Sequence, residues 1–336
     1  MRRVTRHPGP RTRRFAPLAA LACLLPVTVG SVELSLGVYQ RPEGAIAVHL
    51  DGESVDPYFA GKALLTALDL HVDARPAARA WIDWLLPYQR TDGGFDRLCR
   101  RQGQYQSCAS ADSDDATAAV WIELLVRCAP RRDLPPRWKA SLERADRLLA
   151  AIRDPDGGLH RISASLPVSL LMDNVEVYSA FQAVRAYHAR RGEAREARRW
   201  ARRAQGLGRD ILRTFWDPRS GFRPSTQERT EHGFYPDQVA QLFPLLARLR
   251  PARTVEAIRY GDWMARNRDA WRAGGATDYP WGLVAVAAER MHDRASVECW
   301  RVWAAPLRHG PHWNVLEEAI YASFAARSPM PPRCDR

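Results

Sequence analysis

Apolar residues recur along most of the chain with the three- and four-residue spacing of α-helices, and the alternating pattern of β-strands is nearly absent. Helix starts carry capping signals, as where Asp56-Pro57 places an N-cap before a proline in the first turn. Residues 31–50 are expected to form a further helix or an extended segment. The pattern predicts an all-α fold of about 11–12 helices, over 56–70, 76–89, 114–125, 136–152, 172–189, 193–216, 236–249, 254–271, 279–292, 295–304 and 315–326.

Two kinds of landmark repeat along these predicted helices. Glycine turns follow the even-numbered helices at 92–95, 154–159 and 217–222, and Gly just past a helix end is a C-cap signal. Acidic residues open the odd-numbered helices, with a period of about sixty residues in the first half of the chain. This alternation predicts a ring of helical hairpins, with odd helices inside and even helices outside. The acidic helix starts would then meet at one rim of a central cavity.

The ends of the chain differ from its middle. A basic start, followed by apolar residues from Phe15 to Val29, predicts a signal peptide or N-terminal anchor over 1–30. That apolar stretch is too short for a comfortable membrane span. We therefore expect an exported protein, periplasmic or secreted, with an anchored or cytoplasmic protein as the alternative. The remaining chain divides into a single helical domain over 31–327 and a Pro-rich tail over 328–336.

The formal charge of +12 comes almost entirely from arginine. No aromatic and basic motif typical of nucleic-acid binding accompanies it, so we do not expect a nucleic-acid partner. The Arg-rich stretch 189–203 is interpreted as a solvated outer helix whose arginines form ion pairs, rather than as a binding patch.

The cysteines predict at most a local crosslink. Cys99 and Cys108 flank a polar loop and are a candidate disulfide in an exported protein. Cys128 and Cys299 lie in apolar helical contexts and are expected to be buried thiols, whereas Cys334 lies in the tail. No Cys or His group has metal-ligand spacing, so we expect no metal and no cofactor.

The acidic stretch 112–115 carries three carboxylates at the start of an apolar helix. One Asp suffices to cap a helix, and three neighbouring carboxylates repel one another, so the cluster favours a chemical role. Asp112 and Asp114 are expected to face the cavity, and Asp115 to serve as the cap or to support them. Capping alone remains the alternative for Asp56, Asp173 and Asp237, where it would contribute about 1 kcal/mol each.

Several short motifs resemble the six-hairpin (α/α)6 glycosidase superfamily, over about residues 38–327. Glu53, together with Asp56-Pro57-Tyr58, is similar to the start of the first barrel helix in family 8 endoglucanases. Asp112-Ser113-Asp114 resembles the Asp-Ala-Asp string of that family, and Tyr235-Pro236-Asp237 resembles its Tyr-Pro-Asp string. Met172-Asp173-Asn174 is similar to the helix start of unsaturated glucuronyl hydrolases, in which an Asp is the acid/base. The Ser-Glu-Gly of family 8 is absent, and Glu53 is one residue out of register with it.

This resemblance implies an (α/α)6 barrel that hydrolyses a poly- or oligosaccharide. Glycoside hydrolysis needs one protonated carboxyl as acid and one ionised carboxylate as base or nucleophile. Asp114 is then the central substrate-side carboxylate, Asp173 or Glu53 the acid, and Asp237 the base or a sugar ligand. The full set of catalytic candidates is Asp112, Asp114, Asp173, Asp237 and Glu53. The substrate-binding candidates are Tyr58, Asp115, Glu176, His232, Tyr235, Trp281 and Trp313.

A second resemblance leads to different chemistry on a related toroid. Residues 112–118 also look like the Asp-x-Asp-Asp-Thr-Ala motif of class II terpene cyclases, and Gln89 with 92–95 resembles their Gln-Trp turns. In that interpretation Asp114 protonates an alkene inside an aromatic-lined pocket. A third alternative is a non-catalytic barrel that binds glycans.

Overall fold

The computed structural model describes residues 33–130, 133–228, 232–249, 253–274, 278–326 and Cys334. Ser31–Arg336 form one compact unit, and residues 1–30, over which the leader is predicted, lie outside the described residues. No helix in the described part of the chain has the length and apolar character needed to cross a membrane.

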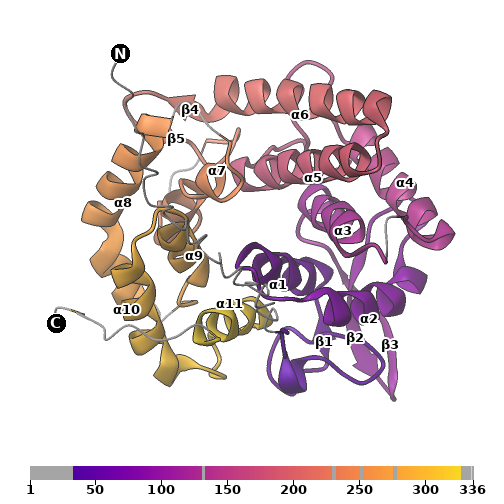
Figure 1. The fold of residues 1–336 in the computed structure, drawn as a ribbon, viewed down its shortest axis with the longest axis horizontal. Helices are drawn as coiled ribbons and strands as arrows, with labels where there is room; N and C mark the ends of the chain where they lie inside the picture. Colours follow the sequence, from indigo (N-terminus) through magenta and orange to yellow (C-terminus); the bar gives the residue numbers. More distant parts are fainter. Residues whose placement is uncertain are drawn as a thin grey trace, which may run out of the picture. The chain divides into compact units, whose positions relative to one another are not determined.

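The compact unit Ser31–Arg336 is a ring of helices in two layers (Figure 1). The inner helices are α1 (Pro57–Asp69), α3 (Asp114–Cys128), α5 (Leu171–Arg190), α7 (Phe243–Leu246), α9 (Gly282–Arg290) and α11 (Val315–Ala325). Each packs against the next, and α11 packs against α1, which closes the ring. The outer helices are α2 (Arg75–Leu85), α4 (Pro136–Ala151), α6 (Ala194–Phe215), α8 (Arg253–Gly274) and α10 (Arg294–Ala304). The predicted all-α toroid is therefore confirmed.

Helical hairpins form because each inner helix is apolar on most sides, whereas each outer helix has one buried face. In α3 almost every residue from Asp115 onward is buried, whereas α6 buries only a stripe that includes Trp200, Leu207 and Ile211. Tight glycine turns connect the layers. Gly93 has a φ of +104°, and a Cβ there would lie 2.3 Å from the Arg144 carbonyl oxygen, so only glycine fits.

Short elements complete the described fold. Single helical turns lie at Gly37–Tyr39, Leu86–Tyr88 and Ala305–Leu307. The strands are β1 (Ser54–Val55), β2 (Asp96–Arg101), β3 (Gln104–Ser110), β4 (Trp216–Asp217) and β5 (Gly221–Phe222). The first three form an antiparallel sheet beside the start of α1, and β4 pairs with β5.

Two predicted segments fold differently. The polar loop 100–107 is mostly part of the β2–β3 hairpin, whose polar and charged residues do not show the alternation that marks a half-buried strand. The single helix predicted over 236–249 is instead a π-helical turn at Phe234–Gln238 followed by the short α7. Pro236 and Pro244 lack the N–H that a continuous helix needs, so the helical turns start anew at them.

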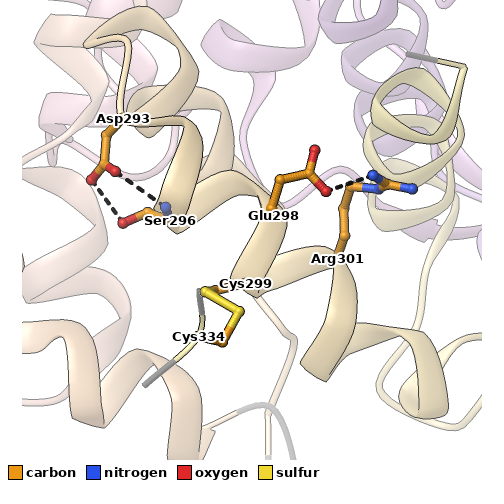
Figure 2. The surroundings of a disulfide bond; sticks show 6 residues. All are labelled: Asp293, Ser296, Glu298, Cys299, Arg301 and Cys334. Carbon is orange, nitrogen blue, oxygen red and sulfur yellow. Dashed lines mark hydrogen bonds and ion pairs between the residues drawn. A yellow bond between two sulfur atoms is a disulfide. The ribbon is translucent and has the colours of Figure 1, made fainter. Parts of the chain in front are cut away.

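The cysteines form two disulfide bonds in the described part of the chain. Cys99 and Cys108 join the strands of the β2–β3 hairpin. Cys299 of α10 is joined to Cys334, so the tail is fastened to the outer layer of the ring (Figure 2). The expectation of a free thiol at Cys299 was wrong because its partner comes from a distant part of the sequence. Cys128 is a free, buried thiol.

Candidate active site

The N-terminal ends of the inner helices lie together, and we refer to them as the rim. Arg97 of β2 contacts both Asp56, the N-cap of α1, and Asp112, just before α3. Ser113, the N-cap of α3, hydrogen-bonds Asp173 in the first turn of α5. Glu317 in the first turn of α11 accepts from the backbone N–H of Gly282, where α9 begins. These contacts connect neighbouring helix starts around much of the ring.

Two buried carboxyls meet at the hydroxyl of Ser113, and we call Asp115, Ser113 and Asp173 the carboxyl cluster. The Ser113 Oγ lies 2.5 Å from Asp115 Oδ1 and 2.7 Å from Asp173 Oδ2. The backbone N–H of Ala116 donates to the same Asp115 oxygen at 2.9 Å. Asp115 is fully buried and Asp173 is 7% exposed. One hydroxyl proton cannot be donated to two carboxylates at once, so this geometry favours a further proton on the cluster.

Burial also favours the protonated form of both carboxyls. Desolvation, followed by the negative charge of Asp173, raises the pKa of Asp115 well above its ordinary value. Desolvation and the charge of Glu176 raise the pKa of Asp173 to about 6. Like charges that share a buried site cannot both ionise without a large cost, so the cluster retains a proton close to neutral pH.

Glu176 lies one helical turn after Asp173 and is held by two donors from α1. Tyr58 Oη donates to Glu176 Oε1 at 2.9 Å, and Lys62 Nζ donates to the same oxygen at 2.5 Å. Desolvation and the Glu176 charge raise the pKa of Tyr58, so its hydroxyl remains a donor. The other oxygen of Glu176 is buried and has no hydrogen-bond partner within the described residues.

Asp112 and Asp114 do not form the cavity-facing pair that the sequence predicts. Asp112 is exposed, with 78% of its side chain accessible, and contacts Arg97. Asp114 Oδ1 accepts from Arg90 Nη2 at 2.7 Å. Successive helical residues point about 100° apart, so only one of the neighbours Asp114 and Asp115 can face α5. Asp115 takes that direction, and Ser113 takes the capping position.

The π-helical turn before α7 supplies another carboxylate and an aromatic pair. Asp237 is buried, and its Oδ2 accepts from the Gly233 N–H at 2.9 Å while His232 Nδ1 lies 3.3 Å from Oδ1. Tyr235 is 51% exposed, and its ring stacks on Trp281 with centroids 4.8 Å apart and an angle of 17°. Both rings lie at the rim, since Tyr235 belongs to the turn before α7 and Trp281 is the N-cap residue of α9.

Two predicted site residues do not take the expected position. Trp313 is fully buried, stacks on Trp300, and donates from Nε1 to Glu318 Oε2 at 3.1 Å. It therefore cannot stack on a ligand, and the prediction was wrong because a Trp beside a helix start can also fill the core. Glu53 is exposed beside β1, and its carboxylate makes no hydrogen bond or ion pair with any other described residue.

Three residues of this region were not among the predicted site residues. Ser113 connects the two buried carboxyls, and Lys62 holds Glu176. Lys62 is one of two lysines in the chain and follows Tyr58 by one helical turn, which is the signal that identifies it. Glu317 accepts from the Gly282 N–H at 2.9 and 3.1 Å, and burial together with the charge of Asp278 raises its pKa to about 8 despite that bond.

A cavity that is partly open to solvent lies between the inner helices. Near the rim it is lined by Lys62 of α1 and Glu176 of α5. Farther from the rim it is lined by Asp69 of α1, Glu123 of α3 and Arg290 of α9. Asp69 pairs with Arg290 at 2.9 Å, so charges line both ends of the cavity.

No protein-family model and no curated protein matches the sequence. Among solved structures, a reducing end xylose-releasing exo-oligoxylanase matches with a TM-score of 0.59 at 15% identity, over 85% of this chain and 84% of that chain. A D-mannose isomerase matches with a TM-score of 0.55 at 12% identity, over 86% and 94%. A rhamnosidase from Klebsiella oxytoca with rhamnose bound has a TM-score of 0.52 at 14% identity, over 79% of this chain, which spans only 57% of the rhamnosidase. The protein therefore shares its (α/α)6-barrel fold with these enzymes.

Proposed function

We propose that the protein is a carbohydrate-active enzyme, and more specifically a glycoside hydrolase that acts on a poly- or oligosaccharide at the rim. The observation that carries the proposal is the carboxyl cluster, which holds two buried carboxyls on one hydroxyl, at a rim that also carries the half-exposed ring of Tyr235. The glycosidases among the structural neighbours support it at the level of fold. The fold also occurs in an isomerase, so the chemistry has to be argued from the site.

In this proposal Asp173 is the general acid. Its pKa of about 6 allows it to carry a proton near neutral pH and to donate that proton to the leaving glycosidic oxygen. Asp115 is the more deeply buried partner, and together with the Ser113 hydroxyl it holds the Asp173 carboxyl in place. Glu176 contributes negative charge that keeps the Asp173 pKa high.

The second catalytic carboxylate has to come from outside the carboxyl cluster. The carboxyl groups of a glycosidase are about 5–5.5 Å apart in retaining enzymes and about 6.5–9.5 Å apart in inverting enzymes, with the sugar between them. Asp115 and Asp173 contact the same hydroxyl oxygen, which leaves no room for a sugar between them. Asp237 is the proposed base or nucleophile because it follows the exposed Tyr235 at the next helix start on the rim.

The aromatic pair Tyr235 and Trp281 is proposed to bind the sugar by stacking. A half-exposed ring backed by a second parallel ring offers a rigid apolar face, which suits the C–H face of a pyranose. Trp281 is itself fixed by donation from Nε1 to Asp278 at 3.0 Å. Tyr58 and His232 are proposed to form hydrogen bonds with sugar hydroxyls.

The terpene-cyclase alternative has less support. It requires Asp114 as an acid facing an apolar pocket, but Asp114 is ion-paired to Arg90, which also pairs with Asp92 and Asp96. The barrel cavity is lined with charged groups such as Lys62. A non-catalytic glycan-binding barrel is distinguished from an enzyme by turnover.

Two disulfide bonds support a location in an oxidising compartment, and we propose export to the periplasm or the medium. The predicted leader over 1–30 would supply the targeting signal.

The proposal is tested with a panel of oligosaccharides and free aldoses, in which hydrolysis and isomerisation are both measured. Once a substrate is found, Asp173→Asn is expected to lower kcat by about 100-fold or more, because a general acid contributes that much. Asp112→Asn, an equal change at an exposed position, is expected to retain the activity. In the wild type, kcat is expected to fall as the pH rises above about 6, where Asp173 loses its proton.

Full kcat in Asp173→Asn would remove this residue from the chemistry. Isomerisation of an aldose without any hydrolysis would place the protein with the isomerases of this fold.

A further inference from the structure

The solvent-facing side of α6 consists almost entirely of arginine. Apart from Ala194 and Gln205, every exposed residue of this helix is an arginine. We call these residues the arginine stripe: Arg195, Arg198, Arg199, Arg202, Arg209 and Arg213. At 100° per residue they fall within an arc of about 100°, and they extend over about 27 Å of the helix axis.

Ion pairs account for only part of this charge. Arg199 pairs with Glu196 at 3.4 Å, and Arg213 pairs with Asp210 at 3.0 Å. Arg203, which points inward, pairs with Asp146 of α4. The other members of the arginine stripe, which are Arg195, Arg198, Arg202 and Arg209, have no hydrogen bond or ion pair with any described residue. The expected solvated outer helix with ion pairs is present, but its ion pairs involve only some of the arginines.

The composition of this face identifies the kind of partner. A helix that inserts into a membrane surface needs large apolar side chains next to its basic residues. A surface for single-stranded nucleic acid needs exposed aromatic rings on which bases stack. The exposed face of α6 has neither, because its only aromatic residues, Trp200 and Phe215, are buried. Guanidinium groups bind carboxylates, as they bind phosphates, through paired hydrogen bonds, and a polymer of carboxylates needs no apolar or aromatic residue on the protein surface.

The direction of α6 connects the arginine stripe with the rim. A turn of three residues joins α5 to α6, and the two helices pack along each other, so they run antiparallel. The chain after α6 returns to the start of α5, where the Leu171 N–H donates to the Pro224 carbonyl at 2.9 Å. Arg213 therefore lies at the end of α6 nearest Asp173, and Arg195 lies at the far end.

We propose that the arginine stripe is a docking surface for a linear polysaccharide that carries carboxylate groups along its length. A chain bound there extends along the outside of the barrel towards the rim. The spacing of the four unpaired arginines, about 5 to 10 Å along the axis, suits an extended polyanion better than a single small anion. The surface does not depend on the proposed hydrolase activity, because docking requires only the charges of α6.

Binding of alginate, a polymer with one carboxylate per sugar, tests the proposal at low ionic strength. The protein is used as Asp173→Asn, so that possible hydrolysis does not interfere. The stripe variant carries Arg195→Gln, Arg198→Gln, Arg202→Gln and Arg209→Gln, all at exposed positions where Gln is a good helix former. The expected result is alginate binding that strengthens with chain length and weakens about tenfold or more in the stripe variant.

A control variant has the same change in charge at exposed arginines outside α6, namely Arg101, Arg219, Arg266 and Arg294. Its alginate affinity is expected to stay within about twofold of the parent. Circular dichroism verifies the fold, and the double variant Arg198→Gln with Arg202→Gln provides an intermediate loss if the quadruple variant is unstable.

Three results would overturn the proposal. The first is absence of alginate binding, and the second is an equal loss in the stripe and control variants. The third is tighter binding, through the same arginines, to single-stranded DNA or to phosphatidylglycerol vesicles than to alginate. Uncharged dextran is expected not to bind.

Discussion

Glu317 is a buried carboxyl whose ionisation should make the folded protein less stable at alkaline pH. It lies in the first turn of α11 with 3% of its surface exposed, and both of its oxygens accept from the Gly282 N–H. Burial raises its pKa from 4.5 to about 8, and the charge of Asp278 acts in the same direction. The isosteric change Glu317→Gln keeps an oxygen acceptor for Gly282 but cannot ionise.

The sign and size of the effect follow from linkage. The folded protein holds the Glu317 proton up to a higher pH than the unfolded chain, so its stabilising contribution is complete below about pH 4.5 and is lost as the pH rises through about 8. At 1.36 kcal/mol for each tenfold change, the rise from 4.5 to about 8 corresponds to roughly 5 kcal/mol. The amide of Gln adds a constant offset of about 1–3 kcal/mol if its NH2 group lacks a partner, and that offset is independent of pH.

The assay is urea unfolding of wild type and Glu317→Gln at several values between pH 4 and pH 9. Plotting the difference in unfolding free energy against pH removes the contributions of Asp173 and other groups that both proteins share. We expect the unfolding free energy of the variant, relative to that of the wild type, to increase by several kcal/mol between about pH 4.5 and 8 and to stay constant above that. Parallel curves over this range would refute the assignment of a high pKa to Glu317.

Three other changes probe different parts of the site and fold. Ser113→Ala removes both an N-cap and the hydroxyl between the two carboxyls. We expect the free energy of unfolding in urea to fall by about 1 kcal/mol or more and the pH profile of kcat to shift. An unchanged pH profile would contradict the proposed role of Ser113. Tyr235→Ala should raise KM for an oligosaccharide by about fivefold or more with little loss of stability, whereas Trp313→Ala should lower the melting temperature because Trp313 is buried. Cys299→Ser opens a crosslink over a separation of 35 residues and should cost up to about 4 kcal/mol in unfolding free energy; an unchanged melting temperature would contradict it.

The helical hairpins were predictable because the period of apolar positions directly reflects which faces of a helix are buried. The same period located the acidic helix starts, so Asp173 and Asp237 were found together with the rim. Which residue of 112–115 faces the neighbouring helix was not predictable. That choice depends on whether Ser113 or an aspartate occupies the capping position, and a shift of one residue turns a side chain by about 100°.

The arginine partners of Asp112 and Asp114 also could not be predicted from the sequence. Arg90 comes from a turn and Arg97 from a strand, and neither is related to Asp112 or Asp114 by helical spacing. The disulfide bond between Cys299 and Cys334 could not be predicted for the same reason, because pairing between distant residues depends on the closed ring and not on a local sequence pattern.

Arginine has two distinct roles in this protein, and the difference clarifies the rim. Arg90 pairs with Asp114 and Arg97 pairs with Asp112, so each of these two carboxylates has an arginine partner. No arginine forms an ion pair with Asp115 or Asp173 in the described part of the chain. Burial therefore raises the pKa of both carboxyls and favours their protonated forms. On α6 the imbalance is reversed, because the arginines outnumber their acidic partners. The carboxyls that have no arginine partner thus favour proton transfer at the rim. The arginines that have no acidic partner favour binding of an anionic chain on the outside of the barrel.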